Sequence, residues 1–446
     1  MNSRRVVIVG SGFAGFCLAR SLDRLLASSA KSPLEVTLIS PSAAASLSPL
    51  LPGVLSGWVE PWQMRLPLRE ALRRVRWMVG RAVHVDPEAR RVSFDGPGVQ
   101  TGCDPASLPF DDLVFACGTA TDHQGVRGAQ ERCLPFRSLD DALRIRNRVS
   151  EVLEAASGED SSRRRRALCT LVIVGSDPRA CSAALELARR FRLVAPMFPR
   201  LEPGDPHVVL VSPEPQLCAA WGPDGSRFAK AQLDRAGVEV RSEARIESVA
   251  DDHVVVVTPN GSERLDARTV VWTPSSAPSL CVARWSAAPL EQGRLRVDEL
   301  LRVSGADCLY AIGDSAAGPA SGLAAPCSPA RAARNAGWLA AALFDRACGR
   351  TPRSIVGKPW IDPVLLDRDH GLAMVGARCI DGRAGAWLSR RLMIRHMPGL
   401  RRRAAVRVAW TLVCHVPSAE NDPSRLQPAH QTLYLTPPPA PVTGGD

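Results

Sequence analysis

Three glycines near the N-terminus have the spacing of a loop that binds a dinucleotide. Gly10, Gly12 and Gly15 form a complete G-x-G-x-x-G directly after a run of Val and Ile residues. The first glycine permits a tight turn, the second lets the backbone approach a pyrophosphate, and the third lets the following helix pack against the strand. Because a strand precedes the motif and a helical pattern follows it, we predict a dinucleotide site here.

A second loop begins in the same way and then departs from the motif. In LVIVGSDPRACSAALELA, a buried strand leads to Gly175, but Asp177 and Ala180 stand where further glycines are expected. A carboxylate about 4 to 5 Å from a pyrophosphate charge costs on the order of 1 to 4 kcal/mol, and the neighbouring Arg179 offsets part of this repulsion. We therefore predict a degenerate nucleotide site that binds NADH weakly in the usual pose.

The strands that follow the two loops lack the acid that usually holds the ribose hydroxyls. The first strand ends at Ser40 and the second at Ser212, with Glu214 two positions later. Residues 212–216 also lack an arginine that would attract the 2′-phosphate of NADPH. At the first site, Ser40 weakens the prediction of a free NAD but is compatible with a flavin nucleotide that is held by many other contacts. At the second site, Ser212 weakens the prediction of NADH binding.

Two later segments carry groups that suit such a flavin nucleotide. DDLVFACGTAT combines a buried strand with a turn at Cys117 and Gly118. GADCLYAIGDSAAGP is a strand that ends at Gly313 and Asp314, followed by small residues that we expect to begin a helix. A carboxylate at this position accepts a hydrogen bond from a ribityl hydroxyl, and the helix N-terminus faces phosphate or the flavin ring.

Both loops need the same elements around them: an apolar strand, a turn at glycine, a helix and a second strand. RVVIVGSGFAGFCLARSL is followed by EVTLIS, and LVIVGSDPRACSAALELA is followed by HVVLVS. Two such units predict an α/β protein with two doubly wound, Rossmann-like dinucleotide-binding domains, the second inserted in the first. In chain order we expect the first part of the FAD-binding domain, a linker, an NAD-binding-like domain, the second part of the FAD-binding domain, a C-terminal amphipathic helical region and a disordered tail, at residues 1–150, 151–167, 168–282, 283–350, 351–416 and 417–446.

The composition agrees with a turn-rich α/β protein that has large cores. The chain has 446 residues, of which 45% are hydrophobic and 23% charged. Its 13 cysteines and 8 histidines show neither CxxC pairs nor the spacing of metal ligands, so we expect free thiols, a reducing compartment and no metal. The N-terminus has no signal-peptide pattern, and no apolar run approaches the roughly 18 to 20 residues of a membrane span. We predict a cytoplasmic protein, either soluble or peripheral on the inner face of the cell membrane.

The net charge of +11 is compatible with binding to nucleic acid or to a membrane surface, or it merely reflects an arginine-rich composition. The run Arg163–Arg166 has no aromatic residues beside it and is interpreted as a solvated loop, so we predict no nucleic-acid binding. In residues 384–413, Trp and Leu residues alternate with arginines, and Pro398-Gly399 divides the segment into two helices. Such helices suit an anionic bilayer interface; the alternative is a hairpin packed on the body or on a second copy of the chain, as a homodimer.

Taken together, these segments resemble one family in order and spacing. VVIVGSGFAG, SPLLPG, LVFACGTAT, TVVWTPSSAPS and LYAIGDSA are similar to the motifs of type II NADH dehydrogenases, FAD enzymes that pass electrons from NADH to quinone. The segment DRDHGLAMVGARCIDGRAGAWLSRRLMIRHMPGLRRR also resembles the membrane-docking region of that family, and it favours this family over other disulfide-reductase relatives. The resemblance covers roughly residues 5–412.

The resemblance implies hydride transfer to flavin N5, followed by electron transfer to a quinone-like acceptor, with the protein supplying position and electrostatics. It places FAD from the first loop, at the pyrophosphate, to Asp314 at the ribityl chain, with Leu51 and Pro52 near the isoalloxazine. The implied FAD contacts are Gly10, Gly12, Phe13, Ala14, Gly15, Ser40, Leu51, Pro52, Cys117, Gly118, Gly313 and Asp314. The residues of the degenerate NAD site are Gly175, Asp177, Arg179 and Ser212.

The chain departs from that family at the donor end and at the quinone end. The resemblance implies a Glu near the site of hydride transfer, where Ser182 stands, so we assign no catalytic acid or base. It also implies paired glutamines before a glycine on the helix near the flavin, where this chain has Asn335 and Ala336 before Gly337. Asn335 retains one amide for contact with a quinone, and Ala336 removes the other.

Three other functions stay open on the sequence. A sulfide:quinone oxidoreductase would use redox cysteines; Cys181 lies at one such position, and Cys327 or Cys379 would have to replace a second. A flavoprotein with a different donor or substrate would keep the second domain as architecture, and a flavin-binding or interaction protein would have little turnover. The glutathione-reductase type is excluded, because no CxxxxC pair lies on the helix after the first loop.

Overall fold

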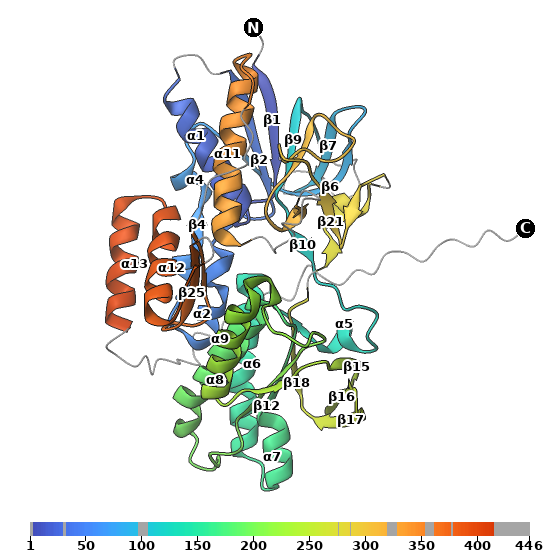
Figure 1. Ribbon diagram of the computed structural model, residues 1–446, viewed down its shortest axis with the longest axis vertical. Helices are drawn as coiled ribbons and strands as arrows, with labels where there is room; N and C mark the ends of the chain where they lie inside the picture. The colour runs from blue at the N-terminus through green and yellow to red at the C-terminus, as the bar shows by residue number, and fades with distance from the viewer. Residues whose placement is uncertain are drawn as a thin grey trace, which may run out of the picture.

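The computed structural model of the protein describes residues 3–29, 33–96, 106–274, 276–285, 287–318, 328–352, 361–375 and 378–413. Two parallel sheets lie one above the other along the long axis of the molecule, and a pair of C-terminal helices stands beside them (Figure 1). None of the described helices is both long enough and apolar enough to cross a membrane.

The first sheet carries the first glycine loop. Its strand order is β22-β9-β1-β2-β5 and all neighbours are parallel, so β1 lies between β9 and β2. Its strands are β1 (Arg4–Val9), β2 (Leu34–Ser40), β5 (Arg76–Val79), β9 (Asp112–Phe115) and β22 (Leu309–Ala311). Because β22 follows the whole second sheet in the chain, the first domain is assembled from two separate segments.

The second sheet repeats this arrangement. Its order is β11-β18-β12-β13-β14, again parallel, so β12 lies between β18 and β13. Its strands are β11 (Leu134–Pro135), β12 (Thr170–Val174), β13 (His207–Val211), β14 (Glu239–Arg241) and β18 (Thr269–Trp272). In such sheets ligands bind beyond the carboxyl ends of the central strands, where the strand order reverses, and both glycine loops lie there.

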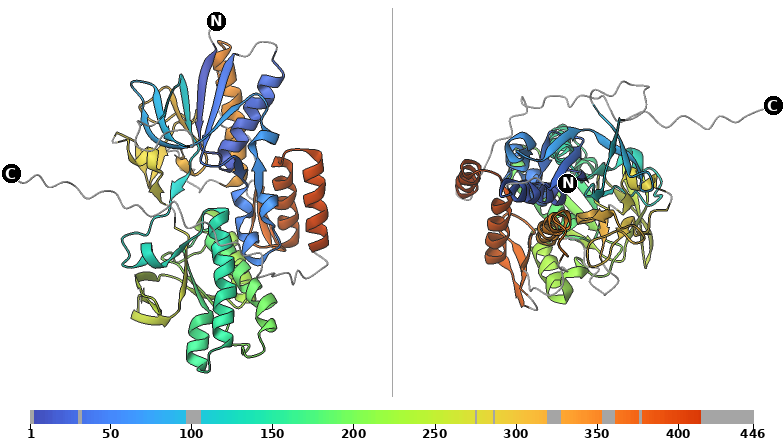
Figure 2. Two further views of the ribbon diagram at one scale, coloured as in Figure 1. Left: turned by 180° about the vertical axis from the view of Figure 1, so that it is seen from behind. Right: turned by 90° about the horizontal axis from the view of Figure 1, so that it is seen from above.

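Helices cover the sheets and join the two domains. The helices α1 and α11 run side by side on the first sheet (Figures 1 and 2). The α-helices are α1 (Phe13–Ala27), α2 (Leu51–Ser56), α3 (Pro61–Met64), α4 (Leu68–Ala71), α5 (Ala129–Arg132), α6 (Leu139–Ser157), α7 (Ser162–Cys169), α8 (Pro178–Val194), α9 (Gly222–Arg235), α10 (Leu280–Ala283), α11 (Pro329–Ala347), α12 (Gly382–His396) and α13 (Leu400–Val413). Short 3₁₀ turns are η1 (Ser48–Leu50), η2 (Ala195–Met197), η3 (Ala219–Trp221) and η4 (Gly313–Ser315).

Smaller sheets complete the described fold, and α12 packs on the last of them, β24-β25-β26. Their strands are β3 (Ala44–Ser46), β4 (Arg65–Pro67), β6 (Arg81–Asp86), β7 (Arg91–Asp95), β8 (Ala106–Pro109), β10 (Thr119–Ala120), β15 (Arg245–Val249), β16 (His253–Thr258), β17 (Gly261–Asp266), β19 (Ala277–Pro278), β20 (Leu290–Glu291), β21 (Arg294–Arg296), β23 (Ala316–Ala317), β24 (Ile361–Leu365), β25 (Gly371–Val375) and β26 (Arg378–Ile380).

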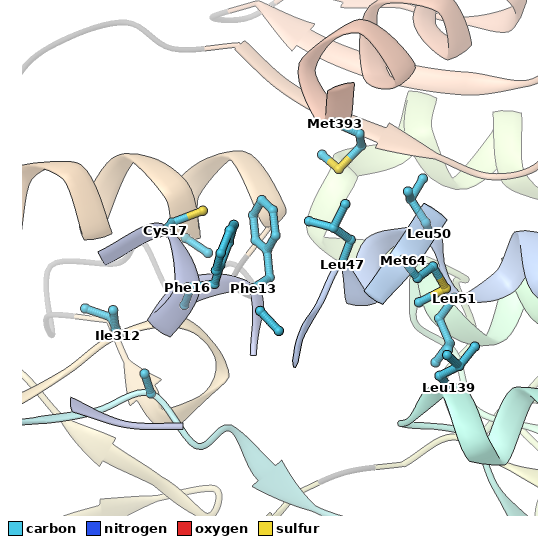
Figure 3. Close-up of a cluster of buried hydrophobic side chains, with 14 of the residues drawn as sticks. Phe13, Phe16, Cys17, Leu47, Leu50, Leu51, Met64, Leu139, Ile312 and Met393 are labelled. Atoms are coloured by element: carbon cyan, nitrogen blue, oxygen red, sulfur yellow. The ribbon is translucent and has the colours of Figure 1, made fainter. Parts of the chain in front are cut away.

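The main hydrophobic core extends from the first sheet to the C-terminal helices. Phe13 and Phe16 of α1, Leu47 before η1 and Met393 of α12 are all buried in it. Figure 3 shows Met393 entering this core from the C-terminal helix, toward Leu47 and Leu50. The C-terminal helices are therefore packed against the body through apolar side chains.

Two local expectations are wrong. Arg163–Arg166 form part of helix α7 and not a solvated loop, because Ser161 caps the helix by accepting a hydrogen bond from the backbone N of Arg164 at 3.4 Å, and arginine favours helices. Arg165 is buried, and its Nε lies 2.6 Å from Oδ2 of Asp205.

The small residues after Asp314 also differ from expectation. Ala316 and Ala317 form strand β23, which pairs with β21, and helix α11 begins only at Pro329. At the C-terminal end, the predicted break is confirmed, since α12 ends before Pro398-Gly399 and α13 begins after it.

Candidate functional site

The first loop is shaped by close backbone contacts that only glycine allows. A Cβ atom on Gly10, whose φ is +104°, would lie 2.6 Å from the carbonyl oxygen of Ala116 at the end of the neighbouring strand. A Cβ atom on Gly15 would overlap the carbonyl oxygen of Gly10, so α1 packs directly on the turn. At Gly12 the nearest atom would be 3.8 Å away, which leaves the open approach that a pyrophosphate needs.

The N-terminus of α1 is not closed by a described side chain. Gly12 is its N-cap residue, and the first turn at Phe13 and Ala14 contains no acid. Backbone N–H groups in a first helical turn have no partners within the helix and carry partial positive charge. These residues fit the pyrophosphate of FAD, which the N–H groups of α1 would hold.

Two other loops meet the first at this edge of the sheet. A Cβ atom on Gly313, whose φ is +65°, would lie 2.7 Å from the Cβ of Ala14 on α1. This contact brings Asp314, whose side chain is 37% exposed, to the first loop. The backbone N of Gly118 donates to Oγ of Ser315 at 2.7 Å and ties the turn after β9 to the same place. The sequence-predicted residues of the three loops are thus close together.

Serine replaces the usual acid at both strand ends in the same way. Ser40 is buried at the end of β2; its hydroxyl lies 2.5 Å from that of Ser11 and donates to the carbonyl oxygen of Ser42 at 2.8 Å. Ser212 is buried after β13 and donates to the carbonyl oxygen of Glu214 at 2.9 Å. Each hydroxyl closes a local turn. Neither strand end therefore supplies the carboxylate that usually binds the ribose hydroxyls.

The start of α2, predicted near the isoalloxazine, lies at the junction of the two domains. Leu51 is 2% exposed and lies near Met64 and Leu139 in the core (Figure 3). Pro52 is half-buried, so it is the residue of this pair that keeps accessible surface.

The second loop keeps the backbone shape of the first but closes its helix end. A Cβ atom on Gly175, whose φ is +140°, would collide with Oγ1 of Thr273. Asp177 is the N-cap residue of α8, and its Oδ1 accepts a hydrogen bond from the backbone N of Ala180 at 2.9 Å. This carboxylate occupies the anion position that a pyrophosphate would take, so α8 is stabilised without a bound nucleotide.

Two arginines face the acid of the first domain. Nη2 of Arg179, in the first turn of α8, lies 3.5 Å from Oδ2 of Asp314. Arg137 is close to Gly118, because a Cβ atom on that glycine would lie 3.4 Å from its Nη2. Burial and the neighbouring charge of Arg179 lower the pKa of Arg137. Positive charge therefore gathers around Asp314, where the two domains meet.

An ionisable group lies on α8 one turn beyond the expected position. Ser182 is buried, and its hydroxyl donates to the carbonyl oxygen of Leu365 at 3.2 Å. Glu186 is fully buried; Nε1 of Trp58 donates to its Oε1 at 2.7 Å, and the hydroxyl of Ser56 donates to its Oε2. Burial raises the pKa of Glu186 to about 7, although both hydrogen bonds act in the opposite direction.

Glu186 is not among the site residues predicted from the sequence. The signal was its place in AALELA, a Glu surrounded by apolar residues four positions after Ser182, on the buried side of α8. A second residue without an assigned role is His396 at the end of α12, which packs edge-on against Phe13 with 5.4 Å between ring centroids. Burial, with nearby arginines, lowers its pKa to about 4, so a neutral imidazole packs against the ring of Phe13.

The predicted quinone residues lie on α11. Asn335 is half-buried, and Ala336 is fully buried in the core that α11 shares with α1. The N-terminus of α11 is capped by Ser328, whose hydroxyl accepts from the backbone N of Arg331 at 3.1 Å. This helix end is therefore closed by its own side chain, in contrast to that of α1.

The cysteines considered for sulfide chemistry are Cys181 on α8, Cys379 and Cys327. Sγ of Cys181 lies 3.6 Å from Sγ of Cys218, and both are buried in the second domain. Cys379 is part of β26 in the C-terminal sheet, and Cys327 lies outside the described residues.

Comparisons with known proteins agree with this geometry. The profile of the pyridine nucleotide-disulphide oxidoreductase family matches residues 4–336. The type II NADH:quinone oxidoreductase Ndh of Mycobacterium tuberculosis is 27% identical over 70% of this chain and 67% of its own length. The mitochondrial external alternative NAD(P)H-ubiquinone oxidoreductase B2 of Arabidopsis thaliana is 27% identical over 71% of this chain but 54% of its own length.

Solved structures show the same fold at low sequence identity. NDH2 from Plasmodium falciparum in complex with NADH superimposes with a TM-score of 0.80 at 16% identity, over 93% of this chain and 98% of that one. The sulfide:quinone oxidoreductase of Aquifex aeolicus gives 0.69 at 18% identity, over 88% and 90%. The predicted doubly wound fold and the resemblance to type II NADH dehydrogenases are confirmed, and the chain belongs to the flavin-dependent pyridine nucleotide-disulphide oxidoreductase family.

Proposed function

We propose that the protein passes electrons from a reduced nicotinamide nucleotide through FAD to a quinone-like acceptor. The observation that carries this proposal is the open N-terminus of α1, with Gly12 and Asp314 arranged around it, in a chain whose second domain repeats the first. FAD, when bound, accepts a hydride from the donor and delivers electrons to the acceptor. The quinone in the names of both relatives supports the choice of acceptor.

The donor in this proposal is NADH, bound weakly. The carboxylate of Asp177 closes the end of α8, so a pyrophosphate must displace it and overcome its charge. NADPH is disfavoured, because the arginine on the neighbouring strand end, Arg241, is already paired with Glu239 and Glu263. Glu186 offers a proton near neutral pH at the junction of the domains.

In this proposal the protein meets its quinone-like acceptor at the inner face of the cell membrane. The side of α12 and α13 that points away from the body exposes Trp387 (56%), Leu400 (81%), Val408 (58%) and Leu412 (59%). Arginines lie between them, and the guanidinium of Arg391 stacks over the ring of Trp387 at 5.2 Å. Apolar and basic side chains on one helix face suit an anionic bilayer. A second copy of the chain would cover the same face.

Sulfide oxidation is a weaker candidate. Cys181 has Cys218 as a neighbour, but both thiols are buried, and their mutual hydrogen bond together with burial raises the pKa of Cys218 well above its usual value. Sulfide would have to attack this cysteine pair, in its oxidised form, as the nucleophile, and neither buried sulfur is exposed to it.

The test is anaerobic reduction of the purified holoprotein. We expect a yellow protein that releases FAD on denaturation, flavin bleaching by NADH at high concentration with less effect from NADPH, and recovery of colour on addition of a short-chain quinone. Protein that takes up no FAD would overturn the flavoenzyme proposal. Bleaching by sulfide but not by NADH, abolished by Cys181→Ser, would replace the donor.

A further inference from the structure

A pair of cysteines lies behind the turn that follows β9, at the edge of the proposed FAD site. Sγ of Cys117 is 3.0 Å from Oγ of Ser279, 3.7 Å from Oγ of Ser315 and 3.9 Å from Sγ of Cys281. Cys117 and Cys281 are 164 residues apart in the chain, so only the fold brings them together. Cys117 is half-buried and Cys281, on α10, is buried.

The surroundings of the two thiols make them chemically unequal. Hydrogen bonds from Cys281, Ser279 and Ser315 outweigh burial and lower the pKa of Cys117 to about 7. The charged group that faces Cys117 is the guanidinium of Arg137, and the two groups favour each other's ionised form. Donation to Cys117 and burial raise the pKa of Cys281. At neutral pH Cys117 is therefore substantially a thiolate, and Cys281 keeps its proton.

We propose that Cys117 and Cys281 form a redox-active dithiol, in which Cys117 reacts with hydroperoxides and Cys281 converts the product to an intramolecular disulfide. Its chemistry does not depend on the identity of the electron donor proposed above. A thiolate with three donors, an accessible edge and a second thiol within 4 Å is the arrangement of a reactive cysteine with its resolving partner.

The reaction balances without any further reagent. The Cys117 thiolate attacks one oxygen of the hydroperoxide, the O–O bond breaks, and the alkoxide leaves and takes a proton from water. The product is a sulfenic acid on Cys117. The sulfur of Cys281 then attacks that sulfur, the S–O bond breaks, and hydroxide leaves with the thiol proton as water. The two sulfurs lose two electrons, which the hydroperoxide gains.

The second domain supplies a matched control. Cys181 and Cys218 are closer, at 3.6 Å, but both are buried, and the pKa of Cys218 is well above its usual value. If proximity alone decided reactivity, this pair would oxidise at least as readily. If the thiolate and its donors decide, only the first pair reacts at neutral pH.

The experiment exposes the FAD-loaded protein to hydrogen peroxide, alkylates the remaining thiols and identifies linked peptides by mass spectrometry. We expect a Cys117–Cys281 disulfide that forms half-maximally near pH 7, and no Cys181–Cys218 disulfide. The variant Cys281→Ser should accumulate a sulfenic acid on Cys117 that dimedone traps. Equal oxidation of both pairs, or a Cys281→Ser protein without trapped sulfenic acid, would overturn the proposal.

A milder variant separates reactivity from folding. Ser279→Ala keeps both thiols and removes the shortest contact to Cys117. We expect the pH at which oxidation is half-maximal to move upward in this variant, while the far-ultraviolet circular dichroism stays that of the parent. An unchanged pH profile would show that the hydroxyl does not stabilise the thiolate, and would contradict the proposed site.

Discussion

The carboxyl group of Glu186 is surrounded by protein on all sides, yet its hydrogen-bond partners are an indole N–H and a hydroxyl and not a cation. The ionisable groups closest in effect are Asp367, which raises its pKa, and Arg189, which lowers it. Burial is the largest influence, so the proton stays on the folded protein to about pH 7.

This carboxyl group makes a specific prediction for stability. Its pKa is raised from 4.5 to about 7 by folding, so the folded state binds the extra proton between these values. The contribution of Glu186 to the free energy of unfolding should therefore be highest below about pH 4.5 and should fall as the pH rises to about 7. The variant Glu186→Gln should lose this dependence, so that its stability relative to the parent rises by about 2 to 3 kcal/mol between pH 5 and pH 8.

Urea unfolding at the two pH values measures the effect. The control is Glu151→Gln on α6, whose carboxylate is 60% exposed and pairs with Arg148. Parallel stability–pH curves for the parent and Glu186→Gln would show that the buried carboxyl group does not titrate as described.

At the scale of elements, α1 and α8 follow similar strands and turns, but their N-termini are capped differently. The shared pattern of an apolar strand, a turn at glycine and a helix predicted both loops and their strands, because those are local properties of the chain. From the sequence, Asp177 is expected only as a charge that opposes pyrophosphate; in the structure it is also the N-cap residue of α8. The pair Asp177-Pro178 is a typical N-cap and first helical residue, so this signal was present in the sequence.

Two substitutions at Asp177 separate its charge from its cap. Asp177→Asn keeps a capping side chain and removes the charge, whereas Asp177→Gly removes both and frees the backbone N of Ala180. We expect NADH affinity to rise about fivefold in Asp177→Asn, since about 1 kcal/mol of repulsion is removed, and further in Asp177→Gly. Titration of anaerobic flavin bleaching with NADH measures both.

The stability of these variants serves as the control. Glycine at an N-cap costs only a few tenths of a kcal/mol, so the second domain should stay folded. If neither variant binds NADH more tightly than the parent, the end of α8 does not limit donor binding.

At the scale of the whole molecule, the contacts that unite the parts join residues far apart in the chain. The sequence predicted two helices after residue 384, but it could not show which face each would bury. Val406 and Trp410 of α13 are buried, and Nε1 of Trp410 donates to Oε1 of Gln63 at 3.0 Å, across 347 residues. Such pairings depend on the assembled fold and leave no periodic trace in either segment.

The outward face of these helices carries the remaining prediction. Leu400, Val408 and Leu412 are exposed, so replacing all three with Gln should leave the fold intact. We expect binding to vesicles that contain phosphatidylglycerol to fall at least tenfold, because each buried Leu or Val side chain contributes on the order of 1.5 kcal/mol or more. Cosedimentation at low and high salt measures it.

Exposed apolar residues elsewhere provide the comparison. Met197→Gln with Leu290→Gln changes side chains that are 54% and 41% exposed and belong to η2 and β20. Equal loss of vesicle binding in both variants, or none in the first, would contradict docking through the C-terminal helices. Concentration-dependent dimers lost only in the first variant would assign the face to a second copy of the chain.

One indole ring connects three parts of the molecule. Trp58, in the segment after α2, donates to Glu186 on α8, and its ring meets that of Trp410 on α13 edge-on with 5.7 Å between centroids. Docking of α13 on a membrane, as proposed above, would therefore reach the ring that donates to the buried carboxyl group. If membrane attachment changes the free energy of protonating Glu186, then protonation of Glu186 changes the free energy of membrane attachment by the same amount. In the membrane-docked state proposed above, the pH of the surroundings and the affinity for the membrane would then be coupled.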